Sequence, residues 1–249
     1  RAGINAMARI ANGEYLMKLD GHCMLGEGYD EILKADCEDN WVVVPRRYSI
    51  EVGTKENPKW ERRTDKLHVD HLKLSYPFER DDVACGLHGD RWDSRTRERL
   101  DVLIDKEQSS QGSCYFMHRN MWDRIIGPLD DVNYTSFASE MQEVGCKAWL
   151  SGGQLIVNKK THYSHAHKGK EWGTGYQFNN KEWEVWARNN KQGHDWAVYF
   201  WLSDIWDKQV RSFRWLIEEA GFEPTPGWPD WDTVMKDFEK WKVKNAFGV

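Results

Sequence analysis

A carboxylate and an imidazole stand two residues apart at the expected end of a buried strand. Residues 14–19 have the short apolar composition of such a strand, and Asp20, Gly21 and His22 follow it directly. An aspartate oxygen and a histidine nitrogen at this spacing can bind one divalent cation, and ligands collect beyond the carboxyl ends of strands in open α/β sheets. Gly21 lets the backbone pass close to a bulky ligand such as a diphosphate. This spacing predicts a metal site with Asp20 and His22 as ligands.

A third ligand is expected from the histidine-rich segment 158–170. It contains three candidate imidazoles, those of His162, His165 and His167. If the segment is extended, His165 and His167 share a face and His162 points the other way. A site of one Asp and two His favours Mn²⁺, whereas Mg²⁺ prefers oxygen ligands. In the same segment, the ammonium group of Lys168 could contact diphosphate oxygens.

The surrounding sequence predicts the elements that would position these groups. Helical spacing of apolar residues is found in residues 1–12, 29–36, 119–126 and 139–149. Apolar, β-branched or glycine-led runs that suit strands are found in residues 41–45, 111–118 and 152–157. Helices that alternate with such strands indicate an α/β sheet.

Composition divides the chain of 249 residues into regions. Residues 46–110 carry dense charge and weak alternation, so we expect an insertion over the sheet face, with residues 68–76 as an exposed strand. Residues 171–249 are rich in Trp and have helical spacing, which predicts a helical C-terminal region after a catalytic domain of residues 1–170. Trp rings supply apolar area to a small helical region, and they also stack on sugars and bases.

Charge and cysteine content narrow the function classes. The formal net charge of -5 argues against a broadly basic nucleic-acid surface. No apolar run approaches the roughly 18 residues that a membrane-spanning helix needs. The five cysteines are scattered and form no Cys-x-x-Cys pair, which predicts free thiols in a reducing compartment and hence a cytoplasmic location.

Three separated motifs, taken in order, resemble those of GT-A fold glycosyltransferases. Asp20-Gly-His22 resembles the Asp-x-His metal motif of family-two-type members. Gln111–Arg119 resembles the glycine-led strand that lines the donor-sugar pocket, and residues 140–149 resemble the Glu-rich helix that faces donor and acceptor. The resemblance covers about residues 1–170, and it implies a GT-A-like (Rossmann-like) mixed sheet flanked by helices.

The same resemblance assigns roles to individual residues. Aligning Ser164-His165-Ala166 with the family's Gly-His-hydrophobic pattern favours His165 as the third metal ligand. The expected substrate-binding residues are Gly112, Ser113, Trp149 and Lys168.

Glu140 and Glu143 are the expected catalytic residues. Inverting members usually carry an adjacent acidic pair here, whose second residue is the base that deprotonates the acceptor hydroxyl. In this chain Met141 takes that second position, and the next acid is Glu143. This resembles the Glu-x-x-Glu of the retaining polypeptide N-acetylgalactosaminyltransferases, which also use Asp-x-His. The stereochemical outcome stays open, as does a role of Glu140 in binding donor hydroxyls or in stabilising the helix terminus.

The function that the resemblance implies is metal-dependent transfer of a sugar from a nucleotide-sugar donor to a hydroxyl acceptor. The acceptor stays open between a glycan, a protein, a lipid-linked group and a modified nucleic acid. The units that hold the nucleotide base in that family would come before residue 1, so we expect a fragment, or a fold completed by a second chain or an oligomer. A diverged protein that lacks these units is the third alternative.

Two other functions stay open. The Trp-rich C-terminal region and the missing nucleotide-binding half favour a non-catalytic carbohydrate- or partner-binding module. Three histidines near an Asp-x-His motif also permit a metal-dependent hydrolase.

Overall fold

A mixed sheet of seven strands forms the centre of the computed structural model, which describes residues 1–79, 85–166, 179–222 and 225–245. Its path is β1-β8-β3-β9-β2, with β4 paired to β3 and β7 to β9. The strands are β1 Tyr15–Leu19, β2 Cys23–Leu25, β3 Trp41–Gly53, β4 Pro58–Arg62, β7 Ile104–Lys106, β8 Cys114–His118 and β9 Gln154–His165. Because β8 is antiparallel to both β1 and β3, and β9 is parallel to β3, the carboxyl ends of β1, β3 and β9 meet at one edge.

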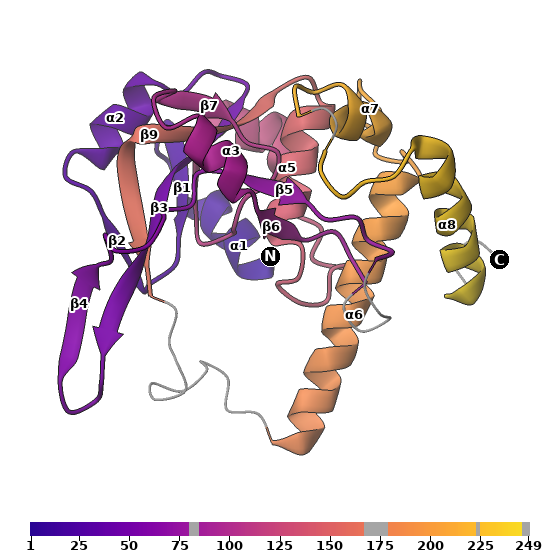
Figure 1. The fold of residues 1–249 in the computed structure, drawn as a ribbon, viewed down its shortest axis with the longest axis horizontal. Helices are drawn as coiled ribbons and strands as arrows, with labels where there is room; N and C mark the ends of the chain where they lie inside the picture. Colours follow the sequence, from indigo (N-terminus) through magenta and orange to yellow (C-terminus); the bar gives the residue numbers. More distant parts are fainter. Residues whose placement is uncertain (80–84, 167–178, 223–224, 246–249) are drawn as a thin grey trace.

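A smaller sheet and the helices surround this centre. Strands β5 Leu72–Leu74 and β6 Gly89–Arg91 form a separate antiparallel pair. The helices are α1 Ala2–Ile10, α2 Tyr29–Ala35, α3 Asp93–Glu98, α4 Arg119–Met121 with its π-helical continuation η1 Trp122–Ile126, α5 Glu140–Leu150, α6 Asn180–Leu202, α7 Phe213–Glu218 and α8 Trp231–Lys244. Helices α6, α7 and α8 lie on the side away from the β3–β4 hairpin (Figure 1). Among the described residues, no helix has the length and apolar character needed to cross a bilayer.

Side chains of β3 alternate between two apolar layers. Val42 and Val44 belong to the main core with α5, whereas Val43 packs with Leu33 of α2 on the other face. A strand covered on both faces needs apolar residues at every position, which explains the unbroken run at its start. The predicted mixed α/β sheet flanked by helices is confirmed.

Two expectations for residues 46–110 differ from the structure. Residues 46–53 continue β3 rather than begin an insertion, with a register shift against β9 at Pro45. The exposed strand expected at 68–76 is wrong, because most of this segment is buried and only Leu72–Leu74 is a strand.

Ion pairs with buried carboxylates account for the dense charge of this segment. Arg46 donates two hydrogen bonds to Asp70, and Arg99 donates two to Asp105. The ammonium of Lys159, on β9, lies 3.9 Å from Asp70 and 3.6 Å from Asp105. The carboxylates of Asp70 and Asp105, of a residue type that normally marks a surface, are thus buried and paired with cations.

The C-terminal helices share the main core with the sheet. Trp201, Phe213 and Phe238 are at most 1% exposed and belong to the same apolar cluster as Val42. Trp201, Trp206 and Trp241 of this region are therefore core residues. The domain boundary expected at residue 170 lies outside the described residues and stays a prediction.

Candidate metal centre and active-site pocket

Three predicted ligands meet at the edge formed by the carboxyl ends of β1 and β9. Asp20 follows β1, His22 lies in the turn before β2, and His165 is the last residue of β9. Their ligand atoms all lie within 4.8 Å of one another, and the rings of His22 and His165 are 4.6 Å apart. Backbone hydrogen bonds hold the ligands in place, from Asp20 to the Ser113 carbonyl and from Ala166 to the His22 carbonyl. We call Asp20, His22 and His165 the candidate metal centre.

The geometry distinguishes between the candidate histidines. His162 lies three positions before His165 on β9, so its ring is on the opposite face. There its Nε2 lies 2.8 Å from the guanidinium of Arg62, and its ring packs edge-on against Tyr48. His167 and Lys168 lie outside the described residues.

A divalent cation fits the candidate metal centre. Ligand bonds of about 2.0–2.6 Å allow two ligands on one ion to lie at most about 5 Å apart, and this cluster meets that limit. Two imidazole nitrogens and one carboxylate suit a transition metal such as Mn²⁺ better than Mg²⁺.

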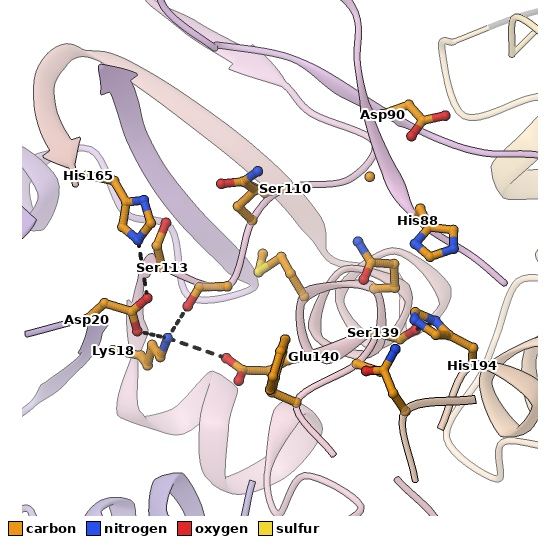
Figure 2. Close-up of a pocket in the computed structure, with 18 of the residues that line it drawn as sticks. Lys18, Asp20, His88, Asp90, Ser110, Ser113, Ser139, Glu140, His165 and His194 are labelled. Atoms are coloured by element: carbon orange, nitrogen blue, oxygen red, sulfur yellow. Dashed lines mark hydrogen bonds and ion pairs between the residues drawn. The ribbon is translucent and has the colours of Figure 1, made fainter. Parts of the chain in front are cut away.

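Lys18 lines the pocket beside Asp20, a position that the sequence analysis did not single out. Its ammonium lies 2.5 Å from Asp20 Oδ1 and 3.8 Å from Glu140 Oε1, and it donates to the Gly112 carbonyl. Figure 2 shows these contacts converging on one nitrogen. Lys18 precedes Asp20 by two residues, and strand alternation places both on one face, so this signal was available.

The contacts of Asp20 keep its carboxyl group ionised. Burial acts to raise its pKa, but hydrogen bonds from His165 and Lys18 outweigh burial and lower the pKa to about 2. Because Lys18 occupies Oδ1, the other oxygen, Oδ2, is the one that lies 3.6 Å from His165 Nε2. One carboxylate oxygen is thus directed at the histidines.

Glu140 faces the pocket from the first position of α5. Burial raises the pKa of its carboxyl group, although Lys18 opposes this. Among the described residues, its Oε1 accepts no hydrogen bond within normal geometry. A carboxylate so placed can accept a proton or bind a ligand hydroxyl.

These groups line one pocket of about 1050 Å³. Gly112 and Ser113, both predicted, form part of its wall, where the Ser113 hydroxyl lies 2.8 Å from Tyr163 Oη. At the far end from Asp20 are His88 and His194, whose rings are 4.5 Å apart (Figure 2). Sequence reasoning missed these two histidines, which are 106 positions apart.

Comparisons with known proteins were made on the sequence and on the structure. No family model and no curated protein matches the sequence. Among solved structures, GalNAc-T7 crystallised with UDP, GalNAc and Mn²⁺ matches with a TM-score of 0.58 and 16% identity. The chain has a GT-A-like fold. The match covers 90% of this chain and 44% of the other, so the chain spans less than half the length of that neighbour.

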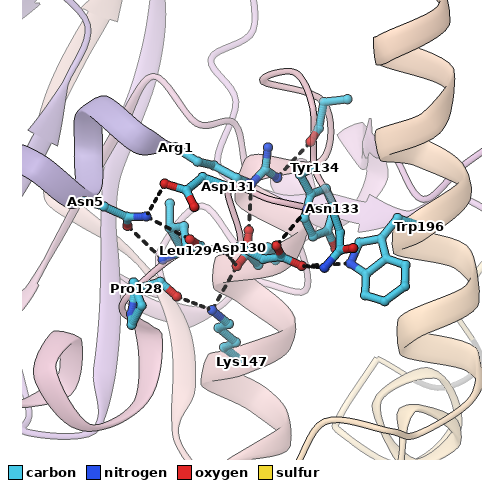
Figure 3. Close-up of polar contacts among 12 residues, drawn as sticks. Arg1, Asn5, Pro128, Leu129, Asp130, Asp131, Asn133, Tyr134, Lys147 and Trp196 are labelled. Atoms are coloured by element: carbon cyan, nitrogen blue, oxygen red, sulfur yellow. Dashed lines mark hydrogen bonds and ion pairs between the residues drawn. The ribbon is translucent and has the colours of Figure 1, made fainter.

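Two predicted site residues of this GT-A-like chain lie outside the pocket. Glu143 is buried, where it accepts hydrogen bonds from the Arg1 guanidinium and the Asp130 amide and pairs with Lys147 at 2.8 Å. Polar contacts of Asn5, Lys147 and Asp130 join α1, α5 and the loop that follows η1 (Figure 3). Trp149 is 1% exposed and donates its indole N–H to the Glu107 carbonyl in the core.

Proposed function

We propose that this chain is a metal-dependent glycosyltransferase that uses a nucleotide-sugar donor. The observation that carries the proposal is the candidate metal centre at one end of a large pocket in a GT-A-like fold. A neighbour in fold, GalNAc-T7, was crystallised with UDP, GalNAc and Mn²⁺, which supports the same class of donor.

The residues of the centre have separate tasks in this proposal. Asp20, His22 and His165 hold Mn²⁺, or Mg²⁺ less well. A bound divalent cation neutralises the charge that grows on a diphosphate leaving group. Lys18 adds a positive charge beside the same group and keeps one oxygen of Asp20 directed at the histidines.

Glu140 is the proposed catalytic carboxylate. It lies between the candidate metal centre and the far end of the pocket, where a sugar attached to a bound diphosphate would reach (Figure 2). We propose Glu143 as the residue that anchors the neighbouring loop, because its carboxylate is already paired with Arg1 and Lys147.

Calorimetric titration of UDP and GDP, with Mn²⁺ or with EDTA, tests the proposal. We expect binding of at least one nucleotide with Mn²⁺ and its loss with EDTA. The variant His165→Ala should lose this binding, whereas His162→Ala is the matched control on the same strand and should keep it.

Other outcomes favour the other functions. Sugar binding that does not depend on the metal would favour a carbohydrate-binding module. Metal-dependent hydrolysis of a substrate by a chain that binds no nucleotide would favour a hydrolase. Either result would replace the proposed glycosyltransferase. The family-two-like assignment, the cytoplasmic location, and a second chain or oligomer stay predictions from the sequence.

A further inference from the structure

Helix α6 contributes one face to the far end of the pocket. Trp186, Asn190 and His194 all line the pocket and are spaced four residues apart, so they lie on one side of the helix. Trp183, one turn earlier, stacks on Trp186 with ring centroids 4.9 Å apart. This spacing extends the pocket wall outward along the helix.

Aromatic rings form a ledge at this end. The aromatic ledge consists of Phe137, Trp183 and Trp186, and the rings of Phe137 and Trp186 are 6.2 Å apart. Trp183 is 56% exposed and Phe137 is 53% exposed, in contrast to the buried Trp residues of the core. Exposed aromatic rings beside a pocket are suited to packing against the apolar faces of sugar rings.

Polar groups beside the ledge can bind hydroxyls. The Ser139 hydroxyl lies 3.0 Å from His194 Nδ1, and the Ser136 hydroxyl donates to the Asn190 side chain at 3.3 Å. His88 lies against His194 from the other wall. Imidazole, amide and hydroxyl groups act as both donors and acceptors, as alternating sugar hydroxyls require.

The charges on α6 favour a neutral ligand. The helix carries three basic and three acidic side chains, so it has no net charge to attract a phosphate backbone. From the ledge and its polar neighbours, we propose that the far end of the pocket is a subsite for a neutral oligosaccharide, which serves as the acceptor. The acceptor role rests on the proposed glycosyltransferase function, whereas the glycan subsite rests on these residues alone.

Tryptophan indole resonances give a direct test. The ¹⁵N-labelled chain is titrated with maltotriose, galactotriose and chitotriose, and the resonances of Trp183 and Trp186 are assigned from their Ala variants. At least one trisaccharide should shift both resonances, and each Ala variant should bind it about tenfold more weakly. Trp60, on β4 and 49% exposed, is the matched control, and neither its resonance nor Trp60→Ala should show an effect.

Three results would overturn the subsite. They are no shift with any trisaccharide, equal shifts at Trp60, and shifts at the ledge only with a single-stranded oligonucleotide or an unglycosylated peptide. Mn²⁺-dependent UDP or GDP binding, measured on the same samples, separates the two proposals. Nucleotide binding without glycan binding overturns the subsite alone, and glycan binding without nucleotide binding supports the subsite while it overturns the transferase.

Discussion

Lys18 and Asp20 form an ion pair in which the ammonium lies 2.5 Å from Oδ1 and leaves Oδ2 facing His165. The pair orients the carboxylate for a cation, yet it also places a fixed positive charge beside that cation. A positive charge this close repels a metal ion and attracts a diphosphate.

Replacing Lys18 should therefore separate these two effects. In Lys18→Met, Mn²⁺ alone should bind about tenfold more tightly, since the repulsion between the two cations is lost. A nucleoside diphosphate with Mn²⁺ should bind more weakly, because one positive charge beside the phosphates is missing. The paramagnetic resonance signal of free Mn²⁺ measures the first and calorimetry measures the second, with Lys18→Arg as the charge-preserving control. Weaker binding of Mn²⁺ alone would show that orienting Asp20 matters more than repulsion.

Glu140 should make activity sensitive to acid. Because burial raises its pKa above that of an ordinary Glu, the ionised form is present above this raised pKa and is lost as the pH falls through it. The acidic limb of the pH–rate profile should thus have an apparent pKa above 4.5. The variant Glu140→Gln should lower the turnover of a donor sugar by about 10²- to 10⁴-fold with Mn²⁺ affinity unchanged. A variant that keeps full turnover and the same acidic limb would remove Glu140 from the chemistry.

Glu143 should affect stability rather than metal binding. Its carboxylate is buried between Arg1 and Lys147, so Glu143→Gln leaves both cations without their anion. We expect a loss of about 3 kcal/mol in the free energy of unfolding, measured with urea. In the exposed pair of Arg214 and Glu218, Glu218→Gln should leave the free energy of unfolding nearly unchanged, because solvent screens the pair. A stable Glu143→Gln without turnover would restore the original prediction of a catalytic role.

Gly86 should control the position of His194. A Cβ at this position would lie 2.8 Å from His194 Nδ1, and its φ of +151° is one that other residues rarely adopt. The variant Gly86→Ala should displace the imidazole from Ser139 and weaken binding of the trisaccharides, with UDP or GDP binding unchanged. It should also lower the free energy of unfolding by about 1–3 kcal/mol. Gly3→Ala is the control, because a Cβ there meets nothing within 4 Å. Unchanged glycan binding in Gly86→Ala would show that His194 is not part of the subsite.

Local sequence patterns were sufficient to predict the strand and the helix that flank the candidate metal centre. The strand that ends before Asp20 and the helix that begins at Glu140 lie where the apolar spacing predicts them. Helical spacing was no guide to the orientation of Glu143, since α5 is buried on nearly all sides and carries no single polar face. Buried carboxylates such as Asp70 and Asp105 look like surface residues in a sequence, because their partners come from other elements.

What the sequence alone determined was the local chemistry: two ligands at one strand end, a histidine-rich segment and an acidic helix start. The family resemblance favoured His165 as the third ligand, but only the tertiary structure shows that His165 rather than His162 faces Asp20, since that depends on how β9 pairs with β2 and β3. Only packing of α6 against the loop before α5 brings His194 beside His88. Spacing within one element follows from backbone geometry, whereas contacts between distant elements depend on how buried faces match, which no short pattern contains.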